Sequence, residues 1–161
     1  MNSSFEGNTS TGKDEWLTPP EIIKAIGDFD LDPCSPIVPP WRTATTMLNI
    51  NDDGLSRKWD GLVWCNPPYG KEAELWLKKC SEHKRCIALI FARTETKSFF
   101  EHIWSKAKAV FFIKGRLCFY HVDGTKGGTA GAPSVLIAWD EETKEMLRDC
   151  KLEGKFLEIN N

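Results

Sequence analysis

The sequence has no apolar run long enough to cross a membrane and no closely spaced pair of cysteines. Its hydrophobic stretches fall well short of the ~20 residues that a membrane-spanning helix needs. None of the six cysteines forms a Cys-x-x-Cys pair, and the two closest are six positions apart, so we expect no zinc site and no metal. We expect no secretion signal before them. We therefore expect a soluble, cytoplasmic protein with reduced thiols, of which Cys65, Cys86 and Cys118 lie in apolar stretches as small buried residues.

The chain also has little net charge. The formal value is −2, which by itself argues against a nucleic-acid-binding protein, but the charges are unevenly distributed. Residues 14–60 contain nine acidic and four basic residues, whereas residues 78–97 contain six basic and two acidic ones, and residues 106–126 five and one. This asymmetry favours one surface for a cationic small molecule and another for a polyanion. Ordinary solvated helix faces would give the same counts, so charge alone leaves both interpretations open.

Internal repeats are missing, and 161 residues allow one domain of ordinary size. We expect a disordered arm over residues 1–13 and one domain over residues 14–161. Apolar periodicity predicts helices over residues 18–29 (capped by Thr18), 71–80, 97–107 and 141–149, and strands over 29–35, 61–65, 86–92, 109–113, 117–122 and 134–139. Residues 36–50 and the glycine-rich segment 123–133 are predicted to be loops. This order predicts an α/β fold with a mostly parallel sheet and an antiparallel edge.

The predicted strand over residues 61–65 ends abruptly on Asn66, Pro67, Pro68 and Tyr69. In an α/β sheet ligands bind at the carboxyl ends of the strands, so these residues should border a pocket. Proline has a fixed φ and no N–H, which leaves the two proline carbonyls in a rigid turn without a local donor. Asn66 adds a side-chain acceptor beside the Pro67 carbonyl. Two rigid acceptors suit an –NH2 group held by both hydrogens, although a plain turn would also account for the four residues.

Holding an amine in this way has a chemical use. The exocyclic nitrogen of adenine or cytosine is a poor nucleophile because its lone pair is delocalised into the ring. Hydrogen bonds to both hydrogens draw the nitrogen toward tetrahedral geometry and free the lone pair, and an electrophile held in line with it supplies positional catalysis. Tyr69 would then stack on a base turned out of the helix.

A second candidate lies upstream, where the predicted strand in FDLDPCS ends on Asp32. A carboxylate at this position can neutralise an ammonium group or bind a ribose hydroxyl. S-adenosylmethionine carries an ammonium and a sulfonium, which agrees with the acidic first third of the chain. An ordinary Asp-Pro turn is the alternative.

Three segments in order, DEWLTPPEII, FDLDPCS and WDGLVWCNPPYG, resemble the adenine-N6 DNA methyltransferases, specifically the bacteriophage-type Dam family. The likeness continues in LIFARTETKSFFEHIW, GRLCFY and GAPSVLIAW, and so covers roughly residues 14–139. It implies a Rossmann-like class I fold and S-adenosylmethionine-dependent methylation of adenine N6 in double-stranded DNA, without a metal. It implies catalytic roles for Asn66, Pro67, Pro68 and Tyr69, and cofactor contacts from Trp16, Thr18, Pro19, Asp32, Pro33 and Asp53 or its neighbour Asp52.

Two features of wider methyltransferases are missing. A glycine-rich turn usually follows the first strand and lets the cofactor approach the backbone, but DPCSPIVPP contains no glycine. There is also no separate domain for target recognition, so we expect residues 123–133 and the region after Arg93 to read the DNA. The predicted phosphate contacts are Arg93, Lys97, Arg116 and Lys126. Phe119 or Tyr120 would line the base pocket, and we expect at least one of the two to pack in the core instead.

Other acceptors present the same planar –NH2 group. Cytosine N4, an RNA adenine or a protein glutamine would suit the same chemistry. A catalytically silent protein that binds nucleic acid without binding a cofactor is an alternative of another class. No motif indicates the target sequence or the oligomeric state.

Overall fold

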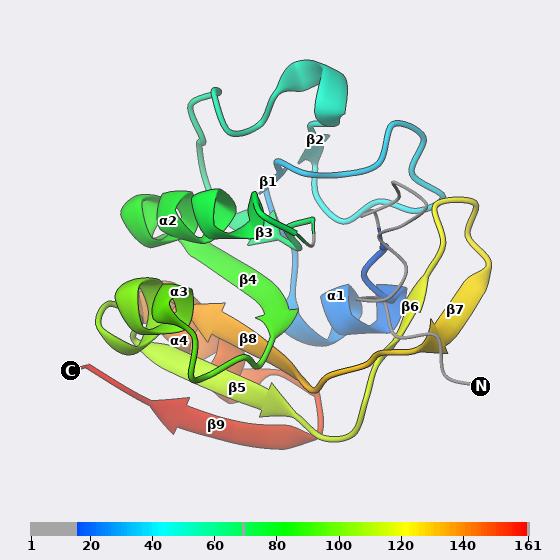
Figure 1. Ribbon diagram of the computed structural model, residues 1–161. Coiled ribbons are helices and arrows are strands. Elements are labelled where there is room, and N and C mark those ends of the chain that lie inside the picture. The colour runs from blue at the N-terminus through cyan, green and yellow to red at the C-terminus, as the bar shows by residue number, and fades with distance from the viewer. Residues whose placement is uncertain (1–15, 69, 161) are drawn as a thin grey trace.

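The chain folds around one mixed β-sheet with helices on both faces (Figure 1). The structure, a computed structural model, describes residues 16–68 and 70–160, so the predicted N-terminal arm and Tyr69 lie outside the described residues. The sheet is built from β1 (Leu31–Asp32), β2 (Thr46–Met47), β3 (Val63–Cys65), β4 (Cys86–Phe91), β5 (Ala109–Ile113), β8 (Ser134–Ala138) and β9 (Gly154–Glu158). Within the described ranges its strand order is β2-β1-β3-β4-β8-β5-β9.

The sheet is parallel in its first half and antiparallel in its second. β2, β1, β3 and β4 pair in parallel, with Leu31 opposite Val63, whereas β8 is antiparallel to both β4 and β5, and β9 is antiparallel to β5. The predicted α/β sheet is therefore confirmed as a mixed one. Antiparallel pairing is not limited to the edge, because β8 is buried along its whole length and lies inside the sheet. The carboxyl ends of β1, β3 and β4 meet at one edge, where ligands bind in such sheets.

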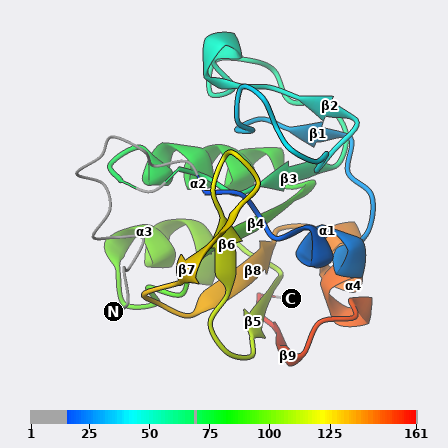
Figure 2. The same ribbon diagram turned by 90° about the vertical axis from the view of Figure 1, so that its right-hand side faces the viewer.

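Helices cover both faces of the sheet (Figure 2). One face carries α1 (Pro20–Ile26) and α4 (Glu141–Asp149), and the other carries α2 (Ala73–His83), α3 (Lys97–Phe99) and the π-helical turn η3 (Phe100–Trp104). Because successive strand side chains alternate between faces, Trp64 packs in the core under Ile22 and Leu147, while Val63 packs in the core under Leu77. No helix in the described part of the chain is long and apolar enough to span a membrane.

Three strands lie where no strand was predicted. β2 and the 3-10 turn η2 (Ile50–Asp52) fall at the end of the predicted loop 36–50. β7 (Lys126–Thr129) falls in the predicted glycine-rich loop and pairs with β6 (Cys118–Tyr120) as a separate two-stranded sheet. β9 follows α4 near the C-terminus. None of these segments has a long apolar run, so their pairing depends on tertiary contacts rather than on local propensity.

Two helix predictions also need correction. The predicted helix over residues 97–107 is shorter and continues as the π-helical turn η3. Thr18 does not cap the first helix, because α1 has Pro19 at its N-cap and no side-chain cap hydrogen bond. The Thr18 hydroxyl instead accepts hydrogen bonds from two side chains of the site described next.

Candidate active site

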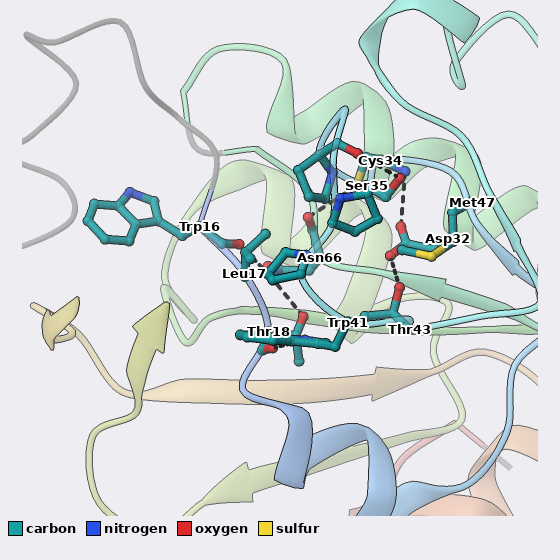
Figure 3. A pocket seen from close by; sticks show the side chains of 13 residues that line it. Trp16, Leu17, Thr18, Asp32, Cys34, Ser35, Trp41, Thr43, Met47 and Asn66 are labelled. Atoms are coloured by element: carbon teal, nitrogen blue, oxygen red, sulfur yellow. Dashed lines mark hydrogen bonds between the residues drawn. The ribbon is translucent and has the colours of Figure 1, made fainter. Parts of the chain in front are cut away.

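A cavity opens at the carboxyl ends of β1 and β3 (Figure 3). Three segments that are far apart in the sequence line it. Trp16, Leu17 and Thr18 precede α1, the segment from Asp32 to Met47 follows β1, and Asn66 follows β3. Four of the residues predicted from sequence, namely Trp16, Thr18, Asp32 and Asn66, therefore lie around one cavity.

Asp32 ends β1 as a buried carboxylate with hydrogen bonds on both oxygens. Its Oδ1 accepts from the backbone N–H of Cys34 at 3.1 Å, and its Oδ2 accepts from the Thr43 hydroxyl. Burial raises the pKa of Asp32 to about 6, although the two hydrogen bonds act in the opposite direction. Burial thus disfavours the charged form of this carboxyl group, and a bound cationic ligand would stabilise that form.

Asn66 has a fixed orientation at the end of β3. Its Nδ2 donates to the Trp16 carbonyl at 3.0 Å and to the Thr18 hydroxyl at 3.1 Å. A carbonyl oxygen only accepts hydrogen bonds, so the amide nitrogen must face Trp16 and the amide oxygen must face away. Within residues 16–68 and 70–160 no side chain or backbone group donates to Oδ1. Asn66 Oδ1 is therefore available at the cavity to accept a hydrogen bond from a ligand.

Thr18 connects this asparagine to the core. Its hydroxyl oxygen accepts from Nε1 of the buried Trp64 at 3.2 Å as well as from Asn66, and its carbonyl accepts from Nε1 of Trp41 at 3.2 Å. The backbone of Asn66 is held too, because its carbonyl accepts from the Cys34 thiol at 3.1 Å. A hydrogen bond with Cys65 and burial raise the pKa of the Cys34 thiol, which keeps it protonated as a donor. All six cysteines are free thiols.

The turn after Asn66 separates this cavity from a second one. Pro67 and Pro68 line the second cavity, which has a volume of about 380 Å³ and is walled mostly by apolar side chains, Phe91 of β4 among them. Asn66 lies on the first cavity and the prolines lie on the second. Tyr69, the last residue of the predicted catalytic motif, lies outside the described residues.

Three predicted cofactor residues do not line the first cavity. Pro19 is the N-cap of α1, and Pro33 is buried directly after Asp32. Asp53 is exposed and ends η2 with a left-handed φ of 54°. The chain nevertheless passes close to the end of β1 here, because a Cβ on Gly54 would lie 2.1 Å from the Pro33 carbonyl oxygen.

The four basic residues predicted to contact DNA are all exposed. Arg93 follows β4 and lines the second cavity, and Lys97 begins α3. Arg116 precedes β6, and Lys126 begins β7. These residues therefore lie on or beside different elements.

The two aromatic candidates for the base pocket have different surroundings. Phe119 is only 1% exposed and belongs to the apolar core, which agrees with the expectation that at least one of the two packs there. The Tyr120 backbone forms an antiparallel bridge with Leu17, and its ring packs edge-on against Trp41 with centroids 5.0 Å apart. Tyr120 therefore supports the wall of the first cavity.

Sequence analysis missed Thr43 and Trp41, which come from the predicted loop. Thr43 donates to Asp32, and Trp41 lines the cavity and donates to Thr18. Their loop has no periodicity from which contacts could be predicted. Only the position of the loop in the sequence could have indicated these two residues. A segment that follows the carboxyl end of a sheet strand lies at the ligand-binding edge.

Comparison with known proteins identifies the family. A sequence model described as DNA N-6-adenine-methyltransferase (Dam) matches residues 7–151. No curated protein and no solved structure gives a significant match. The family match includes β1 with Asp32, β3 with Asn66 and the β6–β7 hairpin, and it extends over most of the 161 residues. The chain therefore belongs to the Dam family of DNA N-6-adenine methyltransferases.

Proposed function

We propose that this protein transfers the methyl group of S-adenosylmethionine to N6 of adenine in double-stranded DNA, on a Rossmann-like class I methyltransferase fold. The observation that carries the proposal is the orientation of Asn66. Its amide nitrogen is occupied by Trp16 and Thr18, which leaves Oδ1 as an acceptor beside the Pro67 turn. Acceptors of this kind are what the two hydrogens of an exocyclic amine need.

The side chains that line the first cavity have the chemistry that the cofactor requires. S-adenosylmethionine, when bound, supplies an electrophilic methyl group on a sulfonium centre. Asp32 would hold its ammonium group, since a buried carboxylate is stabilised by a nearby cation. Trp16 and Thr18 would close over the methionine part, and Pro19, Pro33 and Asp53 would support the edge of the site. The acidic composition of residues 14–60 agrees with a cationic ligand.

We assign the target base to the second cavity. We infer that adenine leaves the double helix and enters between the Pro67–Pro68 turn and the apolar wall that includes Phe91. Asn66 Oδ1 and the Pro67 carbonyl would accept from the N6 hydrogens and localise the lone pair on nitrogen. Tyr69 would stack on the base. Arg93, Lys97, Arg116 and Lys126 would contact phosphates around the flipped nucleotide.

The test is a product analysis. The purified protein is incubated with isotopically labelled S-adenosylmethionine and unmethylated double-stranded DNA, and the digested nucleosides are identified by mass spectrometry. Label in N6-methyl-2′-deoxyadenosine is the expected result. Label in a cytosine nucleoside, or label only when RNA or a glutamine-containing protein replaces the DNA, would show a different acceptor. Binding of DNA without calorimetric binding of the cofactor would indicate a catalytically silent protein.

A further inference from the structure

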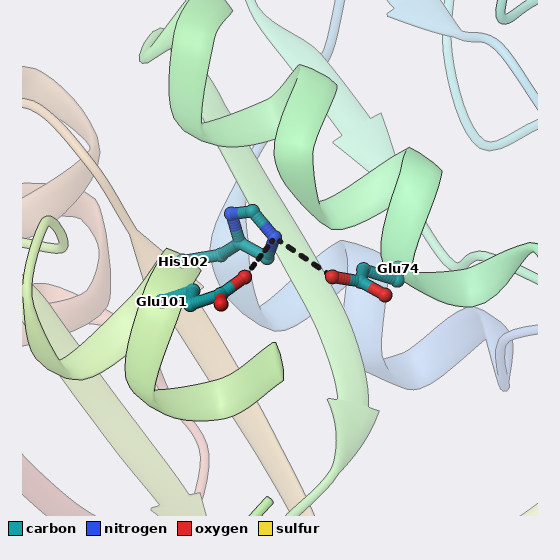
Figure 4. Close-up of side chains that lie close together, drawn as sticks. All are labelled: Glu74, Glu101 and His102. Atoms are coloured by element: carbon teal, nitrogen blue, oxygen red, sulfur yellow. Dashed lines mark ion pairs between the residues drawn. The ribbon is translucent and has the colours of Figure 1, made fainter. Parts of the chain in front are cut away.

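A histidine and two glutamates gather on the helical face that carries α2 and η3, outside the cofactor cavity (Figure 4). Glu74 comes from the first turn of α2, and Glu101 and His102 come from η3. The His102 Nε2 atom lies 3.6 Å from Glu74 Oε1 and 3.9 Å from Glu101 Oε2. The three possible ligand atoms all lie within 4.8 Å of one another.

His102 is the unusual member of this group, because its imidazole ring is buried without a hydrogen bond to any of residues 16–68 and 70–160. Its side chain is only 6% exposed. Neither ring nitrogen has a hydrogen-bond partner in the described part of the chain, and the distances to the two carboxylates are longer than hydrogen bonds. A buried polar atom without a partner is costly, so its place in the structure requires an explanation. The ring is held there by its backbone, whose carbonyl accepts from Nε1 of Trp139 at 2.8 Å.

We propose that Glu74, Glu101 and His102 bind one divalent transition-metal cation of the zinc type. Zinc in proteins has nitrogen and oxygen ligands at about 2.0–2.2 Å, which places the ligand atoms of a tetrahedral site roughly 3.4 Å apart. The distances of 3.6 and 3.9 Å from His102 Nε2 to the two carboxylate oxygens need only a small contraction to reach this value. Both glutamate side chains are about half exposed and are free to rotate toward the ion, whereas the imidazole is already in place.

Charge supports the same conclusion. Two carboxylates converge on one imidazole, and the exposed Lys97 lies 3.6 Å from the other oxygen of Glu101. A divalent cation would neutralise both carboxylates and give Nε2 a partner. Imidazole with carboxylates is a ligand set that transition metals accept, whereas magnesium and calcium prefer oxygen alone.

The site would join two elements around the second cavity. Glu74 lines that cavity, and η3 directly follows α3, whose Phe99 also lines it. A bound ion would therefore fix α2 against η3 at the rim of the cavity. π-helical turns are rare and frequently occur at functional sites, in agreement with this placement.

The test uses zinc alone as the probe on the full, reduced chain. Calorimetry should show one Zn²⁺ bound per chain, and X-ray absorption of the complex should show nitrogen and oxygen ligands at about 2.0–2.2 Å without sulfur at about 2.3 Å. Zinc should also raise the Tm, because it binds the native state. These readouts do not depend on methyl transfer.

Matched variants decide whether these three residues hold the ion. Glu74→Gln changes an exposed side chain and should keep the fold, and it should weaken zinc binding by at least about tenfold. His102→Gln should also weaken zinc binding by at least about tenfold. Glu82→Gln is the control, since Glu82 is an exposed glutamate of the same helix that pairs with Lys78 at 3.6 Å, and it should bind zinc as the wild type does. No binding by the wild type, a sulfur shell from the cysteines, or undiminished binding by Glu74→Gln would each overturn the proposal.

Discussion

At the scale of single residues, Thr18 links the core of the protein to Asn66, the residue proposed to hold the target amine. One hydroxyl oxygen accepts from both Trp64 and Asn66. The arrangement explains why a threonine that precedes a helix is not used as its cap. It also makes the orientation of Asn66 depend on a second residue, which can be tested separately from the amide itself.

Thr18→Val keeps the size of the side chain and removes the hydroxyl. We expect kcat for DNA methylation to fall about tenfold, because Asn66 loses one of the two acceptors that orient it. The free energy of unfolding should fall by about 1–3 kcal/mol, because Nε1 of the buried Trp64 loses its acceptor. Steady-state kinetics and urea denaturation measure the two effects. Thr18→Ser, which retains the hydroxyl, should restore both, and an unchanged kcat in Thr18→Val would show that Thr18 does not orient Asn66.

The raised pKa of Asp32 predicts how stability depends on pH. The pKa is about 6 in the folded protein and 3.8 in an unperturbed carboxyl group. The folded state thus binds the proton more tightly than the unfolded state, so this stabilising contribution is complete below about pH 4 and is lost as the pH rises through about 6. Two pKa units correspond to about 3 kcal/mol. Without cofactor, Asp32→Asn should raise the free energy of unfolding at pH 7.5 by up to about 3 kcal/mol, and the gain should shrink toward pH 4. Urea denaturation at both pH values checks this, and a loss of stability at pH 7.5 would contradict it.

The same group predicts the pH dependence of cofactor binding. Only the ionised carboxylate attracts an ammonium group, so affinity for S-adenosylmethionine should fall by about tenfold per pH unit below about 6. Calorimetry across this range should show the decline in the wild type. Asp32→Asn should bind weakly at every pH and show no such step. A pH-independent affinity in the wild type would place the ammonium group elsewhere.

At the scale of elements, the β6–β7 hairpin supports the cofactor cavity from outside the main sheet. Tyr120 of β6 bridges Leu17, and Trp16 packs across β7 at Gly127. The hairpin therefore holds the segment whose Trp16 carbonyl and Thr18 hydroxyl orient Asn66. This is a structural role for residues that the sequence analysis assigned to DNA recognition.

Gly127→Ala tests this support. An added Cβ would lie 2.7 Å from the Phe119 carbonyl oxygen and 3.0 Å from Trp16 Cζ3. We expect a loss of about 1–3 kcal/mol in the free energy of unfolding and a severalfold weaker affinity for S-adenosylmethionine, because Trp16 must move. Gly128→Ala is the matched control, since Gly128 is exposed and adjacent strand residues face opposite sides. Equal cofactor affinities in the two variants would show that the hairpin does not position Trp16.

The elements that the sequence predicted well are those with strong local signals. β1 ends on Asp32 directly before Pro33, and β3 ends on Cys65 two residues before Pro67. The rule for carboxyl ends places Asp32 and Asn66 at one cavity. β7 could not be predicted, because Lys126–Thr129 is half glycine and has no strand propensity of its own. Thr43 could not be predicted either, because its partner Asp32 lies on another element and no periodicity relates them.

At the scale of the whole molecule, internal partners take up part of the basic charge counted in the sequence. Lys78 pairs with Glu82, Arg85 pairs with Glu142 at 2.5 Å, and Lys79 donates to the Leu55 carbonyl at 2.7 Å. The interpretation as ordinary surface charge therefore holds for these three residues. We propose that a polyanion is bound instead by the bases at the end of β4, at the start of α3 and on the hairpin, of which Lys97 also pairs with Glu101 at 3.6 Å.

The distinction between bases with internal partners and bases proposed to contact DNA predicts how DNA binding depends on salt. If Lys126 contacts a phosphate, Lys126→Gln should reduce the slope of log K against log salt by about 0.9. Lys58→Gln, on the acidic part of the chain where Lys58 pairs with Asp60 at 3.8 Å, should leave the slope unchanged. Fluorescence anisotropy of a labelled duplex over a range of salt concentrations measures both. Equal slopes in the two variants would remove Lys126 from the DNA interface.

The most direct test of the central claim compares Asn66→Ala with the wild type in single-turnover methylation of DNA, alongside calorimetric affinity for S-adenosylmethionine. Because Asn66 Oδ1 is proposed to hold the target amine, methyl transfer should slow by about 100-fold or more. Cofactor affinity should change only a few-fold, because Asp32 and its partners remain in place. Equal losses of rate and affinity would assign Asn66 to the cofactor cavity alone, and an unchanged rate would contradict the proposed mechanism.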